Sequence, residues 1–234
     1  MEKEGTLLET QNKRILWLDA LRGFAIFAML FHHLAFNLTT FFPVSLPFLY
    51  TVLQSRAFEI VQPLFVALFF GISGICCNFS GKPYVRAGRV LLCALLVTLV
   101  TFIAFPNDTI WFGVLHCLGL CMLLYALLKK AVLKMPSLWG LVLSLLLFCL
   151  LFRVPDGFVL SFPLPKDLYK GGLLTVFGFL SPHFQSFDYV PLIPHVFMFF
   201  AGVFLGRFPL PSGKRKFSFF AFLCCFWLLF FSFG

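Results

Sequence analysis

Long apolar runs alternate with short polar segments along most of the chain. Seven runs approach the ~20 residues that a helix needs to cross a bilayer; they are 15–37, 58–78, 88–105, 110–128, 136–153, 191–208 and 216–233. This pattern predicts an all-α, polytopic integral membrane protein with about seven transmembrane helices in a single domain over residues 1–234. Prolines and glycines interrupt the stretch 158–180, so we expect a loop with an interfacial or re-entrant segment there, not an eighth span.

The composition supports this class. The chain is 61% hydrophobic and 12% charged, whereas soluble domains carry roughly 25% charged residues. A soluble fold of 234 residues cannot bury so much apolar surface, which excludes a water-soluble enzyme, a disordered chain and a coiled coil. The cysteines all lie in apolar segments without metal-ligand spacing, so we expect them to be small core residues that form no disulfide and no metal site. We also expect no bound cofactor.

The basic residues predict the orientation. A net charge of +9 could indicate a nucleic-acid partner, but thirteen Lys and Arg residues fall on one side of the predicted spans and three on the other. The positive-inside rule then places the N-terminus in the cytoplasm. We therefore expect a protein of a bacterial inner membrane that contacts the lipid bilayer and binds no nucleic acid.

Several polar residues lie near the predicted cytoplasmic side. Asp19 and Arg22 share one face of the first helix, where they can form an ion pair. Alternatively, Arg22 borders an anion pocket together with Arg86, Arg89 and Arg207. Arginine suits phosphate because its planar guanidinium binds two oxygens at once. For Arg86 and Arg89, ordinary positive-inside topology is the simpler interpretation.

A second polar set lies toward the outer side. His33 is about 21 Å beyond Asp19 along the first helix, at about 1.5 Å per residue. Residues of the other helices reach the same depth: His116, His195, Asp188 and Glu59. A lone intramembrane histidine is usually a helix–helix hydrogen-bonding group, but several beside carboxylates can form a general base with its orienting partner. We predict His33 or His116 as the catalytic base and Asp188 as that partner.

Small residues characterise the second apolar run, at Gly71, Ser73 and Gly74. Such residues allow helices to pack closely, or allow a long, thin ligand to approach the backbone. Both interpretations remain open at this point.

These motifs together resemble one family. The segment WLDALRGFAIFAMLFHHLAFNL contains an Asp, an Arg-Gly pair three residues later and a His ten residues beyond the Gly, here Asp19, Arg22–Gly23 and His33. Further matches are FFGISG at 69–74, Arg86 and Arg89, FP at 105–106, FGVLH at 112–116 and SFDYVPLIPHVFMFFAGVFLGR at 186–207. The chain thus resembles bacterial membrane proteins related to the heparan-α-glucosaminide N-acetyltransferase catalytic domain.

The resemblance implies a transmembrane acetyl transfer. Acetyl-CoA would be the cytosolic co-substrate, and an extracytoplasmic amino sugar or other glycan would be the acceptor. Arg22, Arg86 and Arg89 would hold the CoA phosphates, and Ser73 and Gly74 would line the path of its pantetheine arm. Asn37 stands where many relatives carry Asp, so the carboxylate partner of the histidine would be Asp188 or Glu59.

Two other classes remain open. The first is an O-acyltransferase of the larger bacterial membrane family that shares the Asp…Arg-Gly…His first helix. The second is a transporter or lipid-binding membrane protein without chemistry, although no internal repeat typical of transporters is visible. A homodimer is a further expectation.

Overall fold

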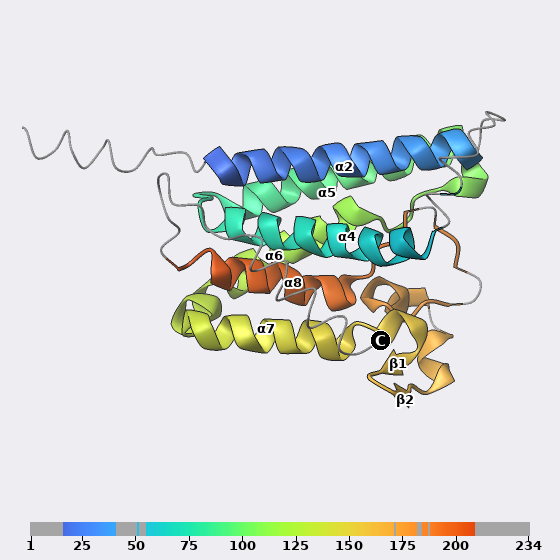
Figure 1. Ribbon diagram of the computed structural model, residues 1–234. Coiled ribbons are helices and arrows are strands. Elements are labelled where there is room, and N and C mark those ends of the chain that lie inside the picture. The colour runs from blue at the N-terminus through green and yellow to red at the C-terminus, as the bar shows by residue number, and fades with distance from the viewer. Residues whose placement is uncertain are drawn as a thin grey trace, which may run out of the picture.

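The computed structural model describes residues 16–40, 51, 55–170, 172–181, 184–186 and 188–208. Its six α-helices lie roughly side by side in a bundle (Figure 1); they are α2 (Leu16–Thr40), α4 (Arg56–Cys77), α5 (Pro83–Ala104), α6 (Val114–Lys134), α7 (Ser137–Leu151) and α8 (Leu192–Leu205). Because the helices alternate in direction, one end of the bundle holds the first residues of α2 and α5 and the last residues of α4, α6 and α8. We call this the basic end, because Arg86, Arg89 and Arg207 lie there. The opposite end, which holds Asp188 and the first turn of α6, is called the acidic end.

Among the described residues, three segments are long and apolar enough to cross a membrane, namely Pro83–Ala104, Val114–Lys134 and Ser137–Asp156. Shorter apolar helical segments cover Gly23–Ala35, Gln62–Cys77 and Leu192–Leu205. The structure thus supports a mostly helical membrane protein with three candidate spans. It does not show all of the seven spans that the hydrophobic pattern predicts. The predicted span 216–233 lies outside the described residues.

Two helices, α5 and α6, have boundaries that differ from the hydrophobic runs by four residues or more. Helix α5 starts at Pro83 instead of residue 88, since proline is favoured in the first turn of a helix. Arg86 therefore lies on the helix and not in a loop. Helix α6 starts at Val114 instead of residue 110 and continues to Lys134 instead of 128. Lysine side chains can extend from a helix end toward the interface, so basic residues do not end the helix.

The segment between α7 and α8 contains short elements only. These are the 3₁₀ helices η2 (Val154–Asp156), η3 (Lys166–Tyr169) and η4 (Gly172–Phe177), and the strands β1 (Phe158–Val159) and β2 (Phe162–Pro163). The two strands pair in antiparallel fashion. Another 3₁₀ turn, η1 (Pro106–Asp108), joins α5 to α6. None of the elements described within 158–180 is long enough to span a bilayer, so this segment is a loop, and the hairpin is the departure from a purely α fold.

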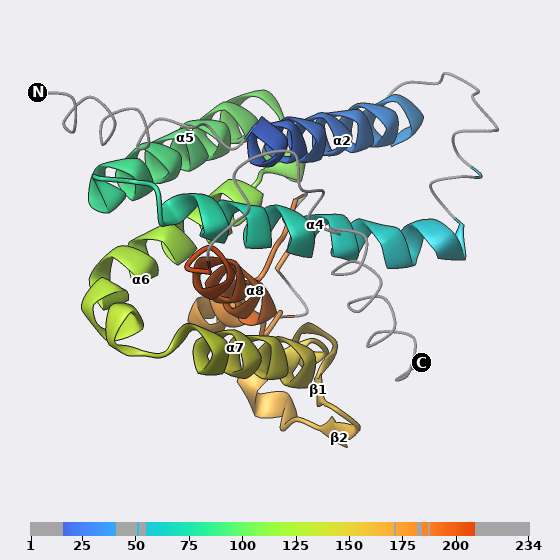
Figure 2. The same cartoon turned by 60° about the vertical axis from the view of Figure 1, so that its left-hand side comes forward.

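The core forms where α4, α6 and α8 meet, around the fully buried Phe70, Cys117 and Phe199. Helices α4 and α8 cross at glycines: a Cβ on Gly202 would lie 1.9 Å from the carbonyl oxygen of Gly71. Small residues allow this backbone-to-backbone approach. The outer faces of α2 and α5 carry exposed apolar side chains, as expected of surfaces that contact lipid. Figure 2 shows α8 enclosed among α4, α6 and α7.

Candidate functional site

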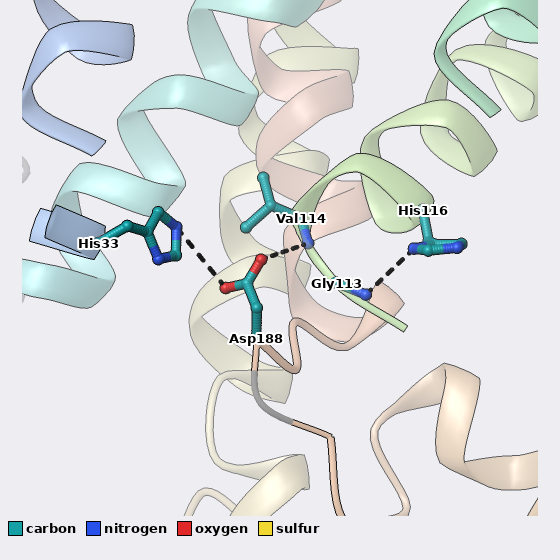
Figure 3. A network of polar contacts seen from close by, with 5 residues as sticks. All are labelled: His33, Gly113, Val114, His116 and Asp188. Atoms are coloured by element: carbon teal, nitrogen blue, oxygen red, sulfur yellow. Dashed lines mark hydrogen bonds and ion pairs between the residues drawn. The ribbon is translucent and has the colours of Figure 1, made fainter. Parts of the chain in front are cut away.

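The acidic end brings together side chains from segments that are far apart in the sequence. Asp188 lies just before α8, His33 lies in the second half of α2, and Gly113 and Val114 begin α6 (Figure 3). The Asp188 Oδ1 atom is 4.0 Å from His33 Nε2. Asp188 Oδ2 accepts a hydrogen bond of 3.4 Å from the backbone N–H of Val114. One carboxylate therefore faces both an imidazole and a helix N-terminus.

Local backbone geometry explains this position of Asp188. The first N–H groups of a helix have no partner within the helix, and the helix dipole favours a negative charge beside them. Gly113 has no Cβ, and one built there would lie 2.9 Å from the Asp188 carbonyl oxygen and 3.0 Å from its Oδ2. The glycine thus permits the close approach of Asp188.

The environment of Asp188 affects its ionisation. Its side chain is 23% exposed, and burial raises the pKa of this carboxyl above the usual 3.8, while His33 and the Val114 N–H act in the opposite direction. A carboxylate in this position can orient a neighbouring imidazole and stabilise it once it is protonated. His33 and Asp188 thus face each other at the distance of an ion pair that forms when the imidazole is protonated.

Backbone contacts hold the Asp188 segment in place. The Trp111 N–H donates to Ser186 Oγ at 3.1 Å, and the Val190 N–H donates to the Phe112 carbonyl at 3.3 Å. On the other side, the Tyr189 hydroxyl donates to the Thr175 carbonyl. The carboxylate is therefore fixed relative to α6 by bonds before and after it in the chain.

His116 has both ring nitrogens engaged. Its Nδ1 accepts a hydrogen bond from the Gly113 N–H at 3.3 Å, and its Nε2 lies 3.1 Å from Thr98 Oγ1. The Thr98 hydroxyl donates its only proton to the Ile110 carbonyl at 2.7 Å. The hydroxyl must therefore accept from His116 Nε2–H, which assigns a neutral imidazole. These contacts make His116 a group that caps α6 and joins it to α5.

His195 is also hydrogen-bonded within the bundle. Its Nδ1 donates to the Pro191 carbonyl at 2.9 Å, and Cys117 Sγ donates to the same oxygen at 3.4 Å. Its ring lies 5.2 Å from the Phe70 ring, centroid to centroid. The structure therefore packs His195 among α4, α6 and α8.

At the basic end, two arginines bind backbone carbonyls. Arg86 Nη1 donates to the Cys76 carbonyl in the last turn of α4 at 3.3 Å. Arg207 donates through Nη1 to the carbonyls of Val132 and Met135, both at 2.8 Å, and through Nη2 to Leu133 at 3.2 Å. Both arginines thus cap helix C-termini, where positive charge is favoured. Arg89 is exposed and makes no hydrogen bond within the described part of the chain.

The remaining predicted residues have different surroundings. Ser73 is buried, and a Cβ on Gly74 would lie 2.0 Å from the Phe199 carbonyl oxygen of α8. The contacts of Gly74 are therefore those of helix packing. The side chains of Arg22, Asn37 and Glu59 lie outside the described part of the structure. Within the described residues, no three His, Cys, Asp or Glu side chains converge as metal ligands.

Three participants were missed from the sequence: Thr98, the backbone N–H of Val114, and Gly113. A signal for the last two is present in FGVLH, where a glycine precedes a helix and a polar residue follows at the third helical position, as in a capping box. Thr98 carries no such signal, because its role depends on contact between α5 and α6.

Comparison with known proteins identifies the family. Residues 14–231 match the family described as Heparan-alpha-glucosaminide N-acetyltransferase, catalytic. No curated protein and no solved structure matches the chain. Since the match covers nearly all of the 234 residues, the chain belongs to the heparan-α-glucosaminide N-acetyltransferase catalytic-domain family.

Proposed function

We propose that this protein is a membrane-embedded acetyltransferase of a bacterial inner membrane. It moves an acetyl group from cytosolic acetyl-CoA to an extracytoplasmic amino sugar or other glycan acceptor. The observation that carries the proposal is the meeting of His33 and Asp188 at the end of the bundle opposite to Arg86 and Arg89. Family membership supplies the reaction class.

In the proposed reaction, His33 is the general base. The acceptor nitrogen attacks the thioester carbonyl of acetyl-CoA and loses its proton to the His33 imidazole. The carbon–sulfur bond then breaks, and the proton returns to the departing CoA thiolate, so the products are the amide and free CoA. Asp188 stabilises the imidazolium between these steps. General acid–base catalysis of this kind contributes about 10²–10⁴-fold to a rate.

The other groups have supporting roles. His116 holds the first turn of α6, whose Val114 N–H binds Asp188, and we assign it as a positioning residue. At the basic end, Arg22 and the exposed Arg89 would bind CoA phosphates, whereas Arg86, predicted as a third phosphate ligand, donates to the Cys76 carbonyl and caps α4. Ser73 remains a proposed lining of the pantetheine path, whereas the backbone of α8 lies directly against Gly74 and leaves no space for a ligand there.

Binding of the co-substrate is the first test. The full-length protein in nanodiscs should bind acetyl-CoA in a calorimetric titration, and Arg22→Ala should weaken that binding. A protein that retains its helical circular-dichroism spectrum but shows no binding would contradict the proposal.

The acceptor requires a second experiment. Cells with and without the protein are supplied with labelled acetyl groups, and their envelope glycans are compared by mass spectrometry. Hydroxylamine releases label from esters and leaves amides intact, which separates O- from N-acetylation. Equal glycan labelling in both strains would argue for a protein without acyl-transfer chemistry.

A further inference from the structure

The β1–β2 hairpin extends away from the helical bundle. Phe158 pairs with Pro163, and Val159 pairs with Phe162. In both ribbon views the hairpin lies beside the end of α7, at the periphery of the molecule, and does not cover the end of the bundle (Figures 1 and 2). Its apolar side chains are open: Leu160 is 46% exposed and Phe162 is 75% exposed. A loop surrounded by water would lose free energy by exposing such side chains together.

An exposed stripe on α7 leads to the hairpin. Trp139, Val142, Leu146 and Cys149 are exposed at alternating spacings of three and four residues, which places them on one helical face. They belong to the candidate membrane span Ser137–Asp156, so we expect this face to contact lipid. Arg153 lies two residues beyond the end of α7 and is exposed. The lipid-facing stripe thus ends in a cation, and the hairpin follows directly.

Arg153 contacts the hairpin itself. Its guanidinium carbon lies 5.0 Å above the centre of the Phe158 ring, and its Nη1 donates to the Leu160 carbonyl at 3.4 Å. The guanidinium has five N–H donors, so further donors remain for an anionic oxygen. The exposed Lys166 follows in the same loop, and the exposed Lys170 is paired with Asp167 at 2.6 Å. A cation beside exposed aromatic and aliphatic groups is typical of the membrane–water interface.

We propose that this hairpin is a membrane-interface anchor. Leu160 and Phe162 insert at the boundary between the headgroups and acyl chains of the bilayer that α7 spans, and Arg153 binds a phospholipid phosphate. The continuity of the hairpin with the lipid-facing stripe of α7 identifies the bilayer as the occupant.

The anchor also has a structural consequence. The loop that follows the hairpin is bonded to η2, just after α7, because the Tyr169 hydroxyl donates to the Val154 carbonyl. Farther along, the Thr175 carbonyl accepts from the Tyr189 hydroxyl, next to Asp188. Lipid contact at Phe162 therefore fixes one end of the loop that holds the Asp188 segment.

The test uses the full-length protein in phosphatidylcholine–phosphatidylglycerol nanodiscs. Phe162→Trp places a fluorescent indole at the hairpin, and the native tryptophan signal is subtracted from the parent protein measured in parallel. Asn107→Trp is the matched control, since Asn107 is exposed in the η1 turn at the same end of the bundle. Lipids brominated near the headgroup should quench the F162W indole at least about twofold more than the N107W indole, and acrylamide should quench it less.

Two results would overturn the proposal. Equal acrylamide quenching of both indoles would place the hairpin in water. Protection of the F162W indole from both quenchers would mean that protein, such as a second copy of the chain, covers it. Adding Arg153→Gln to F162W should reduce the lipid quenching, whereas Arg153→Lys should retain most of it. An unchanged quenching depth in the Gln variant would remove Arg153 from the proposal.

Discussion

The two ends of the bundle use their charged groups in opposite ways. At the acidic end, Asp188 and His116 accept hydrogen bonds from backbone N–H groups at the start of α6. At the basic end, Arg86 and Arg207 donate to carbonyls at the ends of α4 and α6. Helix α6 therefore has acceptors at its N-terminus and a cation at its C-terminus, as its dipole favours.

This difference separates capping groups from ligand-binding groups. A cluster of arginines at a cytoplasmic face is expected from topology alone, and the contacts show that Arg86 and Arg207 satisfy helix ends. Likewise, both ring nitrogens of His116 are engaged in hydrogen bonds. His33, by contrast, does not cap its own helix α2, and it faces Asp188 from a different segment. The groups to test for function are therefore His33, Asp188 and Arg89.

The largest expected effect is the loss of the His33–Asp188 pair. His33→Ala should lower kcat for acetyl transfer by about 10²–10⁴-fold, because the acceptor loses its general base. Asp188→Asn should lower kcat in the same direction, while the dissociation constant for acetyl-CoA changes little. Steady-state transfer kinetics and calorimetric binding in nanodiscs measure the two quantities separately.

Two variants act as controls for this experiment. Asp156→Asn makes the same chemical change at an exposed acid of the neighbouring loop and should leave kcat unchanged. His116→Ala should lower stability by about 1 kcal/mol through the lost cap and lower kcat less than His33→Ala does. If His116→Ala abolished transfer while His33→Ala retained it, the assignment of the base would be wrong.

The second prediction divides the arginines of the basic end. Arg207→Ala removes the cationic partner of three carbonyls and should lower the free energy of unfolding by about 1–3 kcal/mol. Arg89→Ala should leave stability within about 0.5 kcal/mol but weaken acetyl-CoA binding by about tenfold, the equivalent of one charge-assisted hydrogen bond.

Unfolding in mixed micelles and calorimetric titration measure the two effects. The division between caps and phosphate ligands fails if Arg89→Ala unfolds the protein as readily as Arg207→Ala, or if both variants bind acetyl-CoA as the parent does.

The hydrophobic pattern predicted much of the helical arrangement but not its hydrogen bonds. The runs 136–153 and 191–208 agree with α7 and α8 within three residues, because hydropathy reports which residues tolerate lipid. Hydropathy does not report where the hydrogen bonds of a helix begin. The pattern therefore did not predict that α5 begins at Pro83 and carries Arg86 in its first turn. Family membership was correctly predicted from scattered motifs, since their order along the chain is specific even where each is weak.

For the site, depth along the helices carried more information than residue type. Counting helical rise from Asp19 placed His33 at the level of Asp188, and the structure brings these two side chains together. The same argument placed His116 at that level, but depth could not show that Thr98 and Gly113 already engage its ring. Those partners come from the packing of α5 on α6 and from the conformation of one loop, and neither has a periodic signature.

The smallest expected effect is a pH dependence of folding stability. It distinguishes a partly buried Asp188 carboxyl from a solvent-exposed carboxylate that only caps a helix. Since burial raises the pKa of Asp188 in the folded protein above its usual 3.8, the folded state holds this proton to higher pH than the unfolded state does. Stability from this group is therefore highest when both states are protonated and decreases as pH rises through the raised pKa. Asp188→Asn removes this dependence. The melting temperature of the parent relative to D188N should fall as pH rises above the usual carboxyl pKa of 3.8. A parent that instead gains stability over D188N as pH rises would mean that the α6 N-terminus and His33 outweigh burial, so that Asp188 acts chiefly as a helix cap.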